Sequence, residues 1–282
     1  MSGAVPTARC LVPLRSQVHD WRAAADTVAL VPTMGALHRG HLDLVRLAKA
    51  RCRRAVVSIF VNPAQFAPHE DFDRYPRDEA GDLAKLAAAG CDLVWAPERS
   101  EMYPEGFATR IVPGGAAEGL ESDFRPHFFG GVATVCCKLF TQVGPDVAVF
   151  GEKDYQQLCV VRQMVRDLNL PLEIVGVPTV REPDGLALSS RNAYLTPAER
   201  EVAPLLHRVI DDVARVAATR ADVTAAIAEG RSALERAGFK IDYLEVRDAE
   251  TLQAATPGAG RRLRVLVAAW LGKTRLIDNV AA

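Results

Sequence analysis

Two histidines, His38 and His41, lie three positions apart in a turn that also contains Gly35 and Gly40. A short apolar run of β character precedes this turn, and a segment of helical period follows it. In an open α/β sheet, ligands lie beyond the carboxyl ends of the strands, and a helix N-terminus offers free N–H groups to a phosphate. Imidazole rings at such a turn can donate N–H groups to phosphate oxygens as charge builds at phosphorus. The position after a strand favours this interpretation over two ordinary polar residues at a helix start.

Two amide side chains follow the next predicted strand. Asn62 and Gln65 lie at its carboxyl end, beside the strand that leads into the histidine turn. An amide can both donate and accept hydrogen bonds, so these residues suit a polar, uncharged part of a substrate. For Asn62 the alternative stays open that it makes the turn together with Pro63 and has no ligand.

A later strand end carries a charged turn. Gly151, Lys153 and Asp154 directly follow the predicted strand 146–150, and Gln157 lies one helical turn further on, on the same side. Lys153 can place a point charge on a phosphate, and Asp154 can accept a hydrogen bond from a ribose hydroxyl. Asp154 is also a preferred type of N-cap residue, so it can cap the following helix, and the two roles can coexist.

A compact set of donors lies further along the chain. Ser189 and Ser190 are followed by Arg191, shortly after a stretch rich in proline and charge at 178–184. Two hydroxyls and a guanidinium suit a polyphosphate, and a junction between domains would let closure bring them to it. Taken alone, this segment is more typical of a solvated loop.

The elements that must position these residues alternate in type. Short β-rich runs are expected at 27–31, 55–61, 92–96, 146–150 and 173–177, and helices at 41–53, 78–89, 132–142 and 155–168. Such alternation predicts an α/β fold, a Rossmann-like parallel sheet built from βαβ units. Residues 1–178 are therefore expected to form a Rossmann-like domain that binds the nucleotide and the substrate.

The last hundred residues no longer alternate strand with helix. The string TPAE at 196–199 combines an N-cap hydroxyl, a proline at the first helical position and a glutamate three residues after the cap, and a long helix should follow it. A second helix is expected from 223 to about 237, and strands at 241–246, 263–269 and 274–277, the last two joined by a turn. Residues 179–282 are therefore expected to form a small α+β lid domain.

Charge and cysteine content exclude several classes of function. Lys and Arg total 34 against 35 Asp and Glu, so no broad field would attract nucleic acid or an anionic membrane. No apolar run is long enough to span a bilayer, and the broken N-terminal stretch lacks the apolar core of a secretory signal, so we expect a cytoplasmic protein. The six cysteines have no C-x-x-C spacing, which predicts reduced, mostly buried thiols.

Four strings in order carry a resemblance to a known family. The histidine tetrad H-x-G-H at 38–41 resembles the one that opens the ATP site of class I aminoacyl-tRNA synthetases and related nucleotidylyltransferases. Together with its neighbours it looks like the pattern of pantothenate synthetases, and the match runs from about Pro32 to Asn279. The strings are PTMGALH at 32–38, FVNP at 60–63, GEKD at 151–154 and GLALSSRN at 185–192.

The resemblance implies a two-step ligase reaction. Pantoate would attack the α-phosphorus of ATP and release pyrophosphate, and β-alanine would then attack the pantoyl-adenylate and release AMP. It further implies Mg²⁺ with the ATP and a homodimer. By matching position, the catalytic residues would be His38, His41, Lys153 and Arg191, with His41 as the favoured proton donor. Pantoate and β-alanine would be held by Gln65, Gln157 and Asn62. The ATP-binding residues would be Met34, Gly35, His38, Gly40, His41, Gly151, Lys153, Asp154, Val180 (through its backbone, near the adenine), Ser189, Ser190 and Arg191.

Two segments depart from the family pattern. Asp82 matches a position associated with the metal, but its preceding acidic partner is Gly81 here. The family usually reads Leu-Glu-Gly, two variable residues, then Arg-Pro-Gly-His-Phe, where this chain has His127 in place of the second glycine and Phe128 in place of the histidine. Losing a glycine restricts a backbone, so this loop is expected to be altered in order or in substrate handling.

Two other classes of function compete with the ligase. A nucleotidylyltransferase acting on a phosphorylated acceptor would need extra basic residues for the acceptor phosphate, whereas Gln65 and Gln157 suit a neutral diol. A regulatory or RNA-binding module that binds nucleotide without turnover is disfavoured by the near-zero net charge and by the set of phosphate-binding residues.

Overall fold

The structure is a computed structural model that describes residues 4–67, 70–219, 222–255 and 262–282. By its internal contacts the chain divides into two compact units. Unit 1 comprises residues 1–114, 125–152 and 160–178, and unit 2 comprises residues 115–124, 153–159 and 179–282. Unit 2 therefore includes two short segments that lie within the first 178 residues of the sequence.

Unit 1 is built on a parallel sheet. Among the described residues, six strands follow the order β1-β4-β3-β2-β5-β6, and every neighbouring pair is parallel. The strands are β1 (Thr7–Ala8), β2 (Val28–Thr33), β3 (Arg54–Ile59), β4 (Leu93–Trp95), β5 (Val147–Gly151) and β6 (Glu173–Val177). All five predicted strands are present with shifts of a few residues, which confirms the predicted fold class. The short edge strand β1 was not predicted, because two residues carry no readable alternation.

The strand order reverses between β2 and β5. From β2 the chain moves to β3 and β4 on one side, whereas β5 and β6 lie on the other side. Such a reversal leaves a crevice at the carboxyl ends of the two central strands, which is where doubly wound sheets bind ligands. Here those ends are the turn that begins at Met34 and the end of β5 at Gly151.

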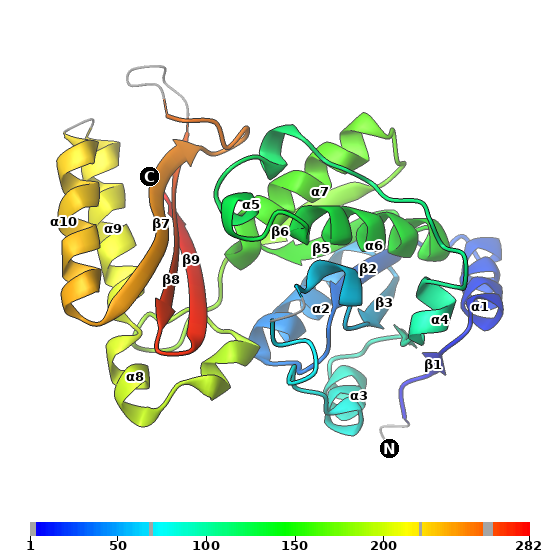
Figure 1. Cartoon of the computed structure of the whole chain (residues 1–282). Coiled ribbons are helices and arrows are strands. Elements are labelled where there is room, and N and C mark those ends of the chain that lie inside the picture. Colours follow the sequence, from blue (N-terminus) through cyan, green and yellow to red (C-terminus); the bar gives the residue numbers. More distant parts are fainter. Residues whose placement is uncertain (1–3, 68–69, 220–221, 256–261) are drawn as a thin grey trace. The chain divides into compact units, whose positions relative to one another are not determined.

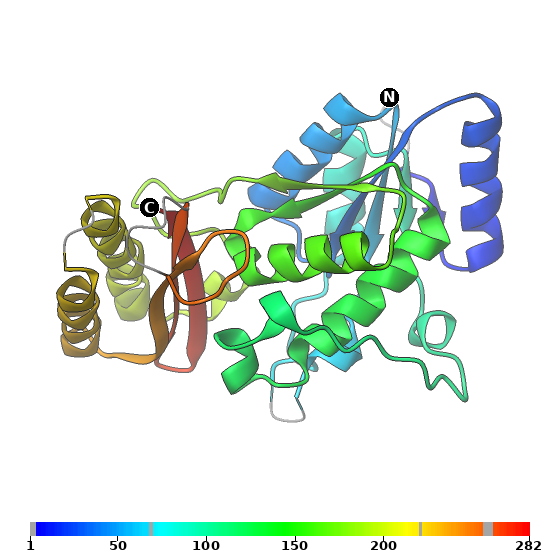
Figure 2. The same ribbon diagram turned by 90° about the horizontal axis from the view of Figure 1, so that it is seen from above.

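Helices cover both faces of this sheet (Figure 2). α2 (Arg39–Arg51) and α3 (Glu79–Ala88) share a buried cluster with one set of alternating strand residues. On the other face, α6 (Phe128–Val143) packs Phe140 against Phe150 of β5, and Trp95 of β4 donates a hydrogen bond to Gln142 at 3.1 Å. α1 (Leu11–Ala23) packs beside α6. The sheet is therefore the buried middle layer of unit 1, as expected for a parallel sheet.

The predicted helices of the α/β region are present with shifted ends. α2 starts at Arg39 rather than at 41, α6 starts at Phe128 rather than at 132, and α7 runs from Tyr155 to Asp167. The helix α1 was not predicted, although Leu14, Val18 and Trp21 are buried at helical spacing. Two short helices, α4 (Arg99–Met102) and α5 (Glu121–Phe124), were also missed, because a single turn has too few residues to show a period.

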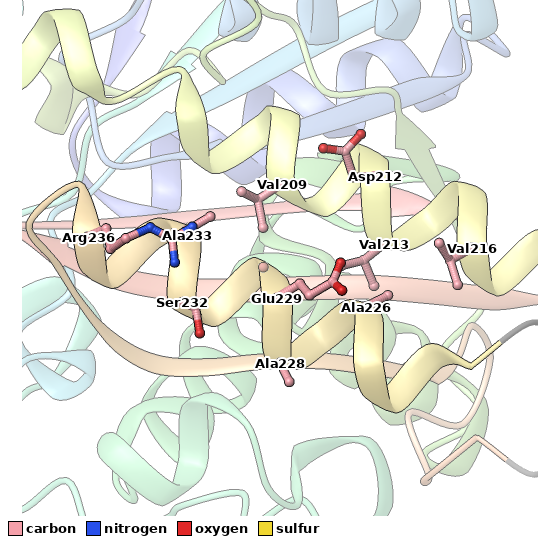
Figure 3. Close-up of a pocket in the computed structure, with 11 residues that line it drawn as sticks. Val209, Asp212, Val213, Val216, Ala226, Ala228, Glu229, Ser232, Ala233 and Arg236 are labelled. Atoms are coloured by element: carbon pink, nitrogen blue, oxygen red, sulfur yellow. The ribbon is translucent and has the colours of Figure 1, made fainter.

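Unit 2 contains an antiparallel sheet covered by two helices (Figure 1). Among the described residues, β7 (Phe239–Asp248), β8 (Leu263–Leu271) and β9 (Thr274–Ala281) pair in that order. Apolar residues of α9 (Leu205–Ala218) and α10 (Val223–Arg236) form one buried cluster with the strands. A pocket between the two helices is lined by Val209, Val216 and Ala226 and by charged groups such as Glu229 (Figure 3). None of the predicted site residues lines this pocket.

The predicted long helix after Thr196 is wrong. The capping box is present, since Thr196 Oγ1 accepts from the Glu199 amide at 3.3 Å and Glu199 accepts from the Thr196 amide at 2.8 Å. The helix that it starts, α8 (Pro197–Val202), ends after six residues, and α9 begins only after Pro204. Proline lacks the N–H that would continue the α8 ladder, so it separates the two helices.

None of the six cysteines forms a disulfide, and most are buried, as predicted. Four of them are buried, and only Cys10 is exposed. Burial raises the pKa of Cys91 and of Cys136 to about 12, which disfavours the reactive thiolate. Within the described ranges, no helix is long and apolar enough to cross a membrane.

Candidate active site

The turn after β2 is held from outside by α3. Gly35 has a φ of +83°, and a Cβ added there would lie 3.2 Å from both Asp82 and Ile59, so the turn requires glycine. Asp82 is 1% exposed and accepts from the Leu37 amide at 2.8 Å. Lys85 donates to the Leu37 carbonyl at 3.0 Å. A buried carboxylate and a lysine thus fix the backbone immediately before the two histidines.

Each histidine uses Nδ1 to cap the helix that begins here. His38 is the N-cap residue of α2, and its Nδ1 accepts from the Gly40 amide at 3.2 Å. Nδ1 of His41 accepts from the His38 amide at 3.3 Å, and the ring centroids lie 4.1 Å apart. A neutral imidazole that accepts at Nδ1 carries its hydrogen on Nε2. The caps therefore make Nε2 the donor nitrogen of both rings, which suits a developing negative charge.

The amides after β3 form a buried group with Met34. Gln65 is 8% exposed, donates to Met34 Sδ at 3.1 Å and accepts from Asn62 Nδ2 at 3.1 Å. Asn62 also donates to the Gly131 carbonyl at 3.1 Å and accepts from the Ala64 amide at 3.2 Å. Its carbonyl oxygen accepts a further hydrogen bond from the Tyr103 hydroxyl at 2.7 Å.

All four hydrogen-bonding positions of the Asn62 amide are thus taken by protein groups. Asn62 therefore orients Gln65. The contacts of Asn62 match the alternative in which it makes the turn with Pro63 and binds no ligand. Sequence reasoning missed Tyr103, because nothing in its neighbourhood signals a partner 41 positions away.

The helix α6 touches this group through a glycine. A Cβ added to Gly131 would lie 2.3 Å from the Ala64 carbonyl oxygen and 2.8 Å from the Gln65 amide nitrogen. Only glycine lets α6 approach the short helix η1 (Pro63–Gln65) so closely.

We expect Gly131→Ala to displace η1, although alanine is ordinarily the better helix former. Overpacking of this kind costs about 2 kcal/mol of unfolding free energy, and the shifted Gln65 should raise severalfold the KM of the polar substrate predicted to bind there. Urea unfolding and steady-state kinetics measure the two effects. Gly130→Ala is the matched control, because its Cβ would meet its nearest neighbour, the Ile111 carbonyl oxygen, at an ordinary 3.5 Å. Equal behaviour of the two variants would contradict this account.

The substitution at His127 adds no backbone strain before α6. His127 stands in the right-handed helical region with φ −89° and ψ −14°, which any residue adopts, so the expected restriction from losing a glycine does not arise. Phe128 lies under the Arg125 guanidinium, 3.8 Å from ring centroid to Cζ. Arg125 also binds Glu70 at 2.9 and 2.7 Å and the Gln65 carbonyl at 3.2 Å. The phenylalanine therefore supports an arginine that holds the backbone of Gln65.

In unit 2, Lys153 and Asp154 lie in the short helix η3 (Glu152–Asp154), which leads into α7. Their charged groups lie 3.8 Å apart, and the Asp154 side chain is 45% exposed. Gln157 follows on the first turn of α7 and is half-buried. The carboxylate of Asp154 is therefore open to solvent at the start of α7, and its capping role stays a prediction.

A hairpin carries the other predicted residues of unit 2. Val180 accepts from the Leu188 amide at 2.9 Å, and Arg181 pairs with Ala187 across an antiparallel bridge. Ser189 follows and caps the short helix η4 (Ser190–Tyr194) by accepting from the Arg191 amide at 3.2 Å. Ser189, Ser190 and Arg191 thus form one ordered turn instead of a solvated loop.

The imidazole of His207 lies beside the turn of this hairpin, since a Cβ added to Gly185 would meet its Cδ2 at 2.8 Å. Burial, and then the charge of Arg181, lower the pKa of His207, although Asp278 and Asp211 oppose the shift. Its Nδ1 is buried, has no hydrogen-bond partner in the described part of the chain and lies 3.7 Å from Asp278.

We therefore expect a pH dependence of stability from His207. Because the folded-state pKa lies below the unfolded value of about 6.5, the unfolded chain binds more protons, and stability falls as pH drops through that value. Urea midpoints at pH 8 and pH 5.5 measure this fall. His207→Gln should make the fall smaller, whereas the exposed His19 changed to Gln should leave it unaltered. An equal fall in both variants would argue against this assignment.

A buried charged network in unit 2 had no sequence signal. Glu121 accepts from the Tyr243 hydroxyl at 2.8 Å and from Arg275 at 2.8 Å, and Arg275 also binds Asp242 at 2.7 Å. Burial alone would lower the pKa of Arg275, but Glu121 and Asp242 raise it above its ordinary value. Burial, and then Glu121, also raise the pKa of Tyr243. The partners are 33 to 154 positions apart, so no local pattern could have revealed them.

The structure thus brings the predicted residues together within each unit. In unit 1, Met34, Gln65 and Asn62 are in direct contact, and His38 and His41 stack at the switch between β2 and β5. A Cβ at Gly151 would meet nothing within 4 Å, so open space adjoins the end of β5. Unit 1 thus provides N–H donors after β2 and amide groups after the neighbouring strand β3, which suits a nucleotide and a small hydroxy acid.

A divalent cation fits this site only if the phosphates of the nucleotide supply most of its ligands. One oxygen of Asp82 is used by the Leu37 amide and by Lys85, which lies 3.4 Å away. Among the described residues, no group of three or more His, Cys, Asp or Glu side chains could hold a metal ion. Mg²⁺ commonly binds through substrate phosphates, waters and one or two carboxylates, so the absence of a protein cage is compatible with it.

Residues 7–281 match the family model described as pantoate-beta-alanine ligase. The chain belongs to this family. A pantothenate synthetase of Bradyrhizobium sp. strain BTAi1 is 58% identical over 282 residues, which is 100% of both chains. The resemblance predicted from four strings is therefore confirmed over nearly the whole chain.

Solved structures agree with this family. The crystal structure of pantothenate synthetase from Thermus thermophilus matches with a TM-score of 0.91 and 49% identity, over 98% of this chain and 99% of that one. A pantoate-beta-alanine ligase from Francisella tularensis, complexed with beta-gamma ATP and beta-alanine, matches with a TM-score of 0.81 and 34% identity. That match covers 99% of this chain and 98% of the other.

Proposed function

We propose that this chain condenses pantoate with β-alanine at the expense of ATP. In the first step a pantoate carboxylate oxygen attacks the α-phosphorus, the bond to the bridging oxygen breaks, and pyrophosphate leaves. In the second step the β-alanine amine attacks the acyl carbon of pantoyl-adenylate, loses a proton and displaces AMP. The observation that carries the proposal is the pair of capped histidines at the strand-order switch of a pantoate-beta-alanine ligase.

The histidines serve the first step. Their Nδ1 atoms are engaged with backbone N–H groups, so the Nε2–H groups are the donors for phosphate oxygens that gain charge as pyrophosphate leaves. His41 is our candidate for the hydrogen-bond donor to the leaving pyrophosphate through its Nε2–H, and the proton stays on the ring. Because the rings are fixed by the helix start, little reorganisation accompanies the step. Met34, Gly35 and Gly40 line the same turn and contact the nucleotide in this proposal.

Gln65 holds pantoate through its amide, and Asn62 contributes by fixing the Gln65 side chain. Gln157, half-buried on the first turn of α7, is the second pantoate ligand. Neutral amides suit the two hydroxyls of pantoate, since each hydroxyl both donates and accepts. A site built in this way discriminates strongly against analogues that lack a hydroxyl, because its buried amides would then lose a partner.

In unit 2, the positive charge of Lys153 and the donors of Ser189, Ser190 and Arg191 bind phosphate oxygens in this proposal. Gly151 and the Asp154 carboxylate contact the nucleotide, and the Val180 backbone contacts the adenine. The hairpin and the cap on η4 support these roles by ordering the donors before any ligand arrives. No nucleophilic side chain is required, because the pantoate carboxylate and the amine of β-alanine are the nucleophiles.

We further propose that Mg²⁺ accompanies ATP, with its phosphates and at most one free oxygen of Asp82 as ligands, and supplies charge neutralisation at the phosphates. The family resemblance also supports a cytoplasmic homodimer. Light scattering after gel filtration tests the oligomeric state, and a dependence of pyrophosphate release on Mg²⁺ tests the metal.

The decisive test is to follow AMP and pyrophosphate with ATP and pantoate, with and without β-alanine. The proposal expects one AMP for each amide formed, with AMP release requiring all three substrates. Transfer of AMP to an acceptor, or nucleotide binding without pyrophosphate release, would replace the ligase by one of the two competing functions.

A further inference from the structure

The last strand of the sheet in unit 2 carries two buried polar residues in sequence. Asp278 and Asn279 lie on β9 with exposures of 4% and 3%. Successive side chains of a strand point to opposite faces, so the two residues reach different parts of unit 2. Buried polar side chains are retained at a cost unless every group finds a partner, and both residues are extensively hydrogen-bonded.

Asn279 is hydrogen-bonded to the backbone at Lys153. Its Nδ2 donates to the Lys153 carbonyl at 2.8 Å, and its Oδ1 accepts from Arg264 Nε at 2.7 Å. The orientation of the amide is unambiguous, because a carbonyl can only accept and a guanidinium can only donate. Arg264 in turn lies over the ring of Tyr155, 4.0 Å from its centroid. Asn279 therefore holds the turn directly at Lys153 and, through Arg264, indirectly at Tyr155.

Asp278 holds the hairpin on the other face. Its two oxygens bind Arg181 at 2.6 and 3.0 Å, and Arg181 also donates to the Gly185 carbonyl at 3.1 Å. Asp278 Oδ1 additionally accepts from the backbone N–H of Asn279 at 2.7 Å. The neighbouring helix η4, which contains Ser190 and Arg191, packs against β9.

We propose that Asn279 is a positioning residue for Lys153, and that the Asp278–Asn279 pair sets the spacing between the two phosphate-binding segments of unit 2. The proposal rests on the proposed function of Lys153 and Arg191. A paired strand suits this role, because its hydrogen-bonded backbone keeps adjacent residues at a fixed separation. A displacement of about 1 Å at Lys153 is expected to slow adenylate formation about a hundredfold.

Asn279→Asp tests this inference with the least change in shape. The variant keeps the acceptor for Arg264 but turns an oxygen toward the Lys153 carbonyl, so the donated hydrogen bond is lost. We expect pantoate-dependent pyrophosphate release to fall about 10- to 100-fold while the KM for β-alanine stays within twofold. Asn279→Ser, which removes both contacts with a smaller side chain, should act in the same direction if the aspartate variant does not fold. Leu276→Val on the same strand is the control, since it should lower Tm and leave the rate unchanged.

A double-mutant cycle separates positioning from a general loss of structure. In a Lys153→Ala background, Asn279→Asp should cost less than about twofold, because the group it positions is already absent. Equal losses in both backgrounds, or retention of full rate by both Asn279 variants, would overturn the inference.

If the intact chain forms no AMP, the proposed function fails by itself. The parent, the two single variants and the double variant of the cycle are then compared by calorimetric titration with a non-hydrolysable ATP analogue. If Asn279→Asp weakens binding in the parent but not in the Lys153→Ala background, the positioning role of Asn279 is still supported. Unchanged affinity would reject it.

Discussion

Replacing Lys153 with alanine is expected to lower the rate of pantoate-dependent pyrophosphate release about a thousandfold. The ammonium lies at the start of α7, its side chain is 20% exposed, and Asn279 holds the backbone beneath it. A fixed positive charge aimed at oxygens that gain charge in the transition state contributes mainly to kcat, and removing one such group costs about 10²–10³ in rate. The measurement is a single-turnover assay with saturating ATP and pantoate.

The matched control is Lys273→Ala, which removes an exposed lysine from the turn between β8 and β9. It should leave both kcat and KM within twofold of the parent. Should Lys153→Ala keep its rate within fivefold, Lys153 is not the phosphate-binding group, and Arg191 would become the principal candidate.

Replacing Arg275 with alanine is expected to destabilise the protein by about 3–5 kcal/mol. The guanidinium is 13% exposed and neutralises Glu121 and Asp242, whose side chains are 7% and 8% exposed. Its removal takes this cation away from two buried carboxylates, and losing a buried ion pair costs far more than a surface pair gains. Urea unfolding followed by circular dichroism gives the change in free energy.

The pH dependence of this deficit adds a second test. An unpaired buried carboxylate has a folded-state pKa above its unfolded value, so protonation relieves it, and the deficit should shrink as pH falls toward about 5. Arg215→Ala, which breaks a surface pair whose arginine is 70% exposed, should change stability by about 1 kcal/mol or less. A comparable small effect for Arg275→Ala would show that water reaches the network.

Much of the fold of unit 1 could be predicted from the sequence, because its longer strands read as β-rich runs and most of its longer helices show helical periodicity. The predicted strand 173–177 agrees with β6 at both ends. The histidine turn, the Asn62 turn and the Lys153 turn were all placed at carboxyl ends of strands, where the structure has them. Their roles with substrates stay proposals that the assays above address.

Other features could not be predicted, because they depend on which segments meet in space. Glycine is needed at 131 because the backbone of Ala64 in η1, 67 positions earlier in the chain, lies against it. The division of residues 197–218 into α8 and α9 was missed because the helix start at Thr196 and the apolar stripe at 205–216 were assigned to one helix, although α8 has no buried residue. In that case the local signal of the proline was present and was outweighed by periodicity.

The sequence by itself determined the family, the parallel sheet and the types of group at each strand end, because motif strings and periodicity are local properties. Only the tertiary structure decided which nitrogen of His38 and His41 carries the hydrogen, since that depends on the backbone N–H each ring meets. It also decided that Asn62 is fully engaged by protein groups, and that Asn279 reaches the Lys153 carbonyl 126 positions away. Hydrogen bonds between distant segments follow from sheet register and packing, which no window of neighbouring residues records.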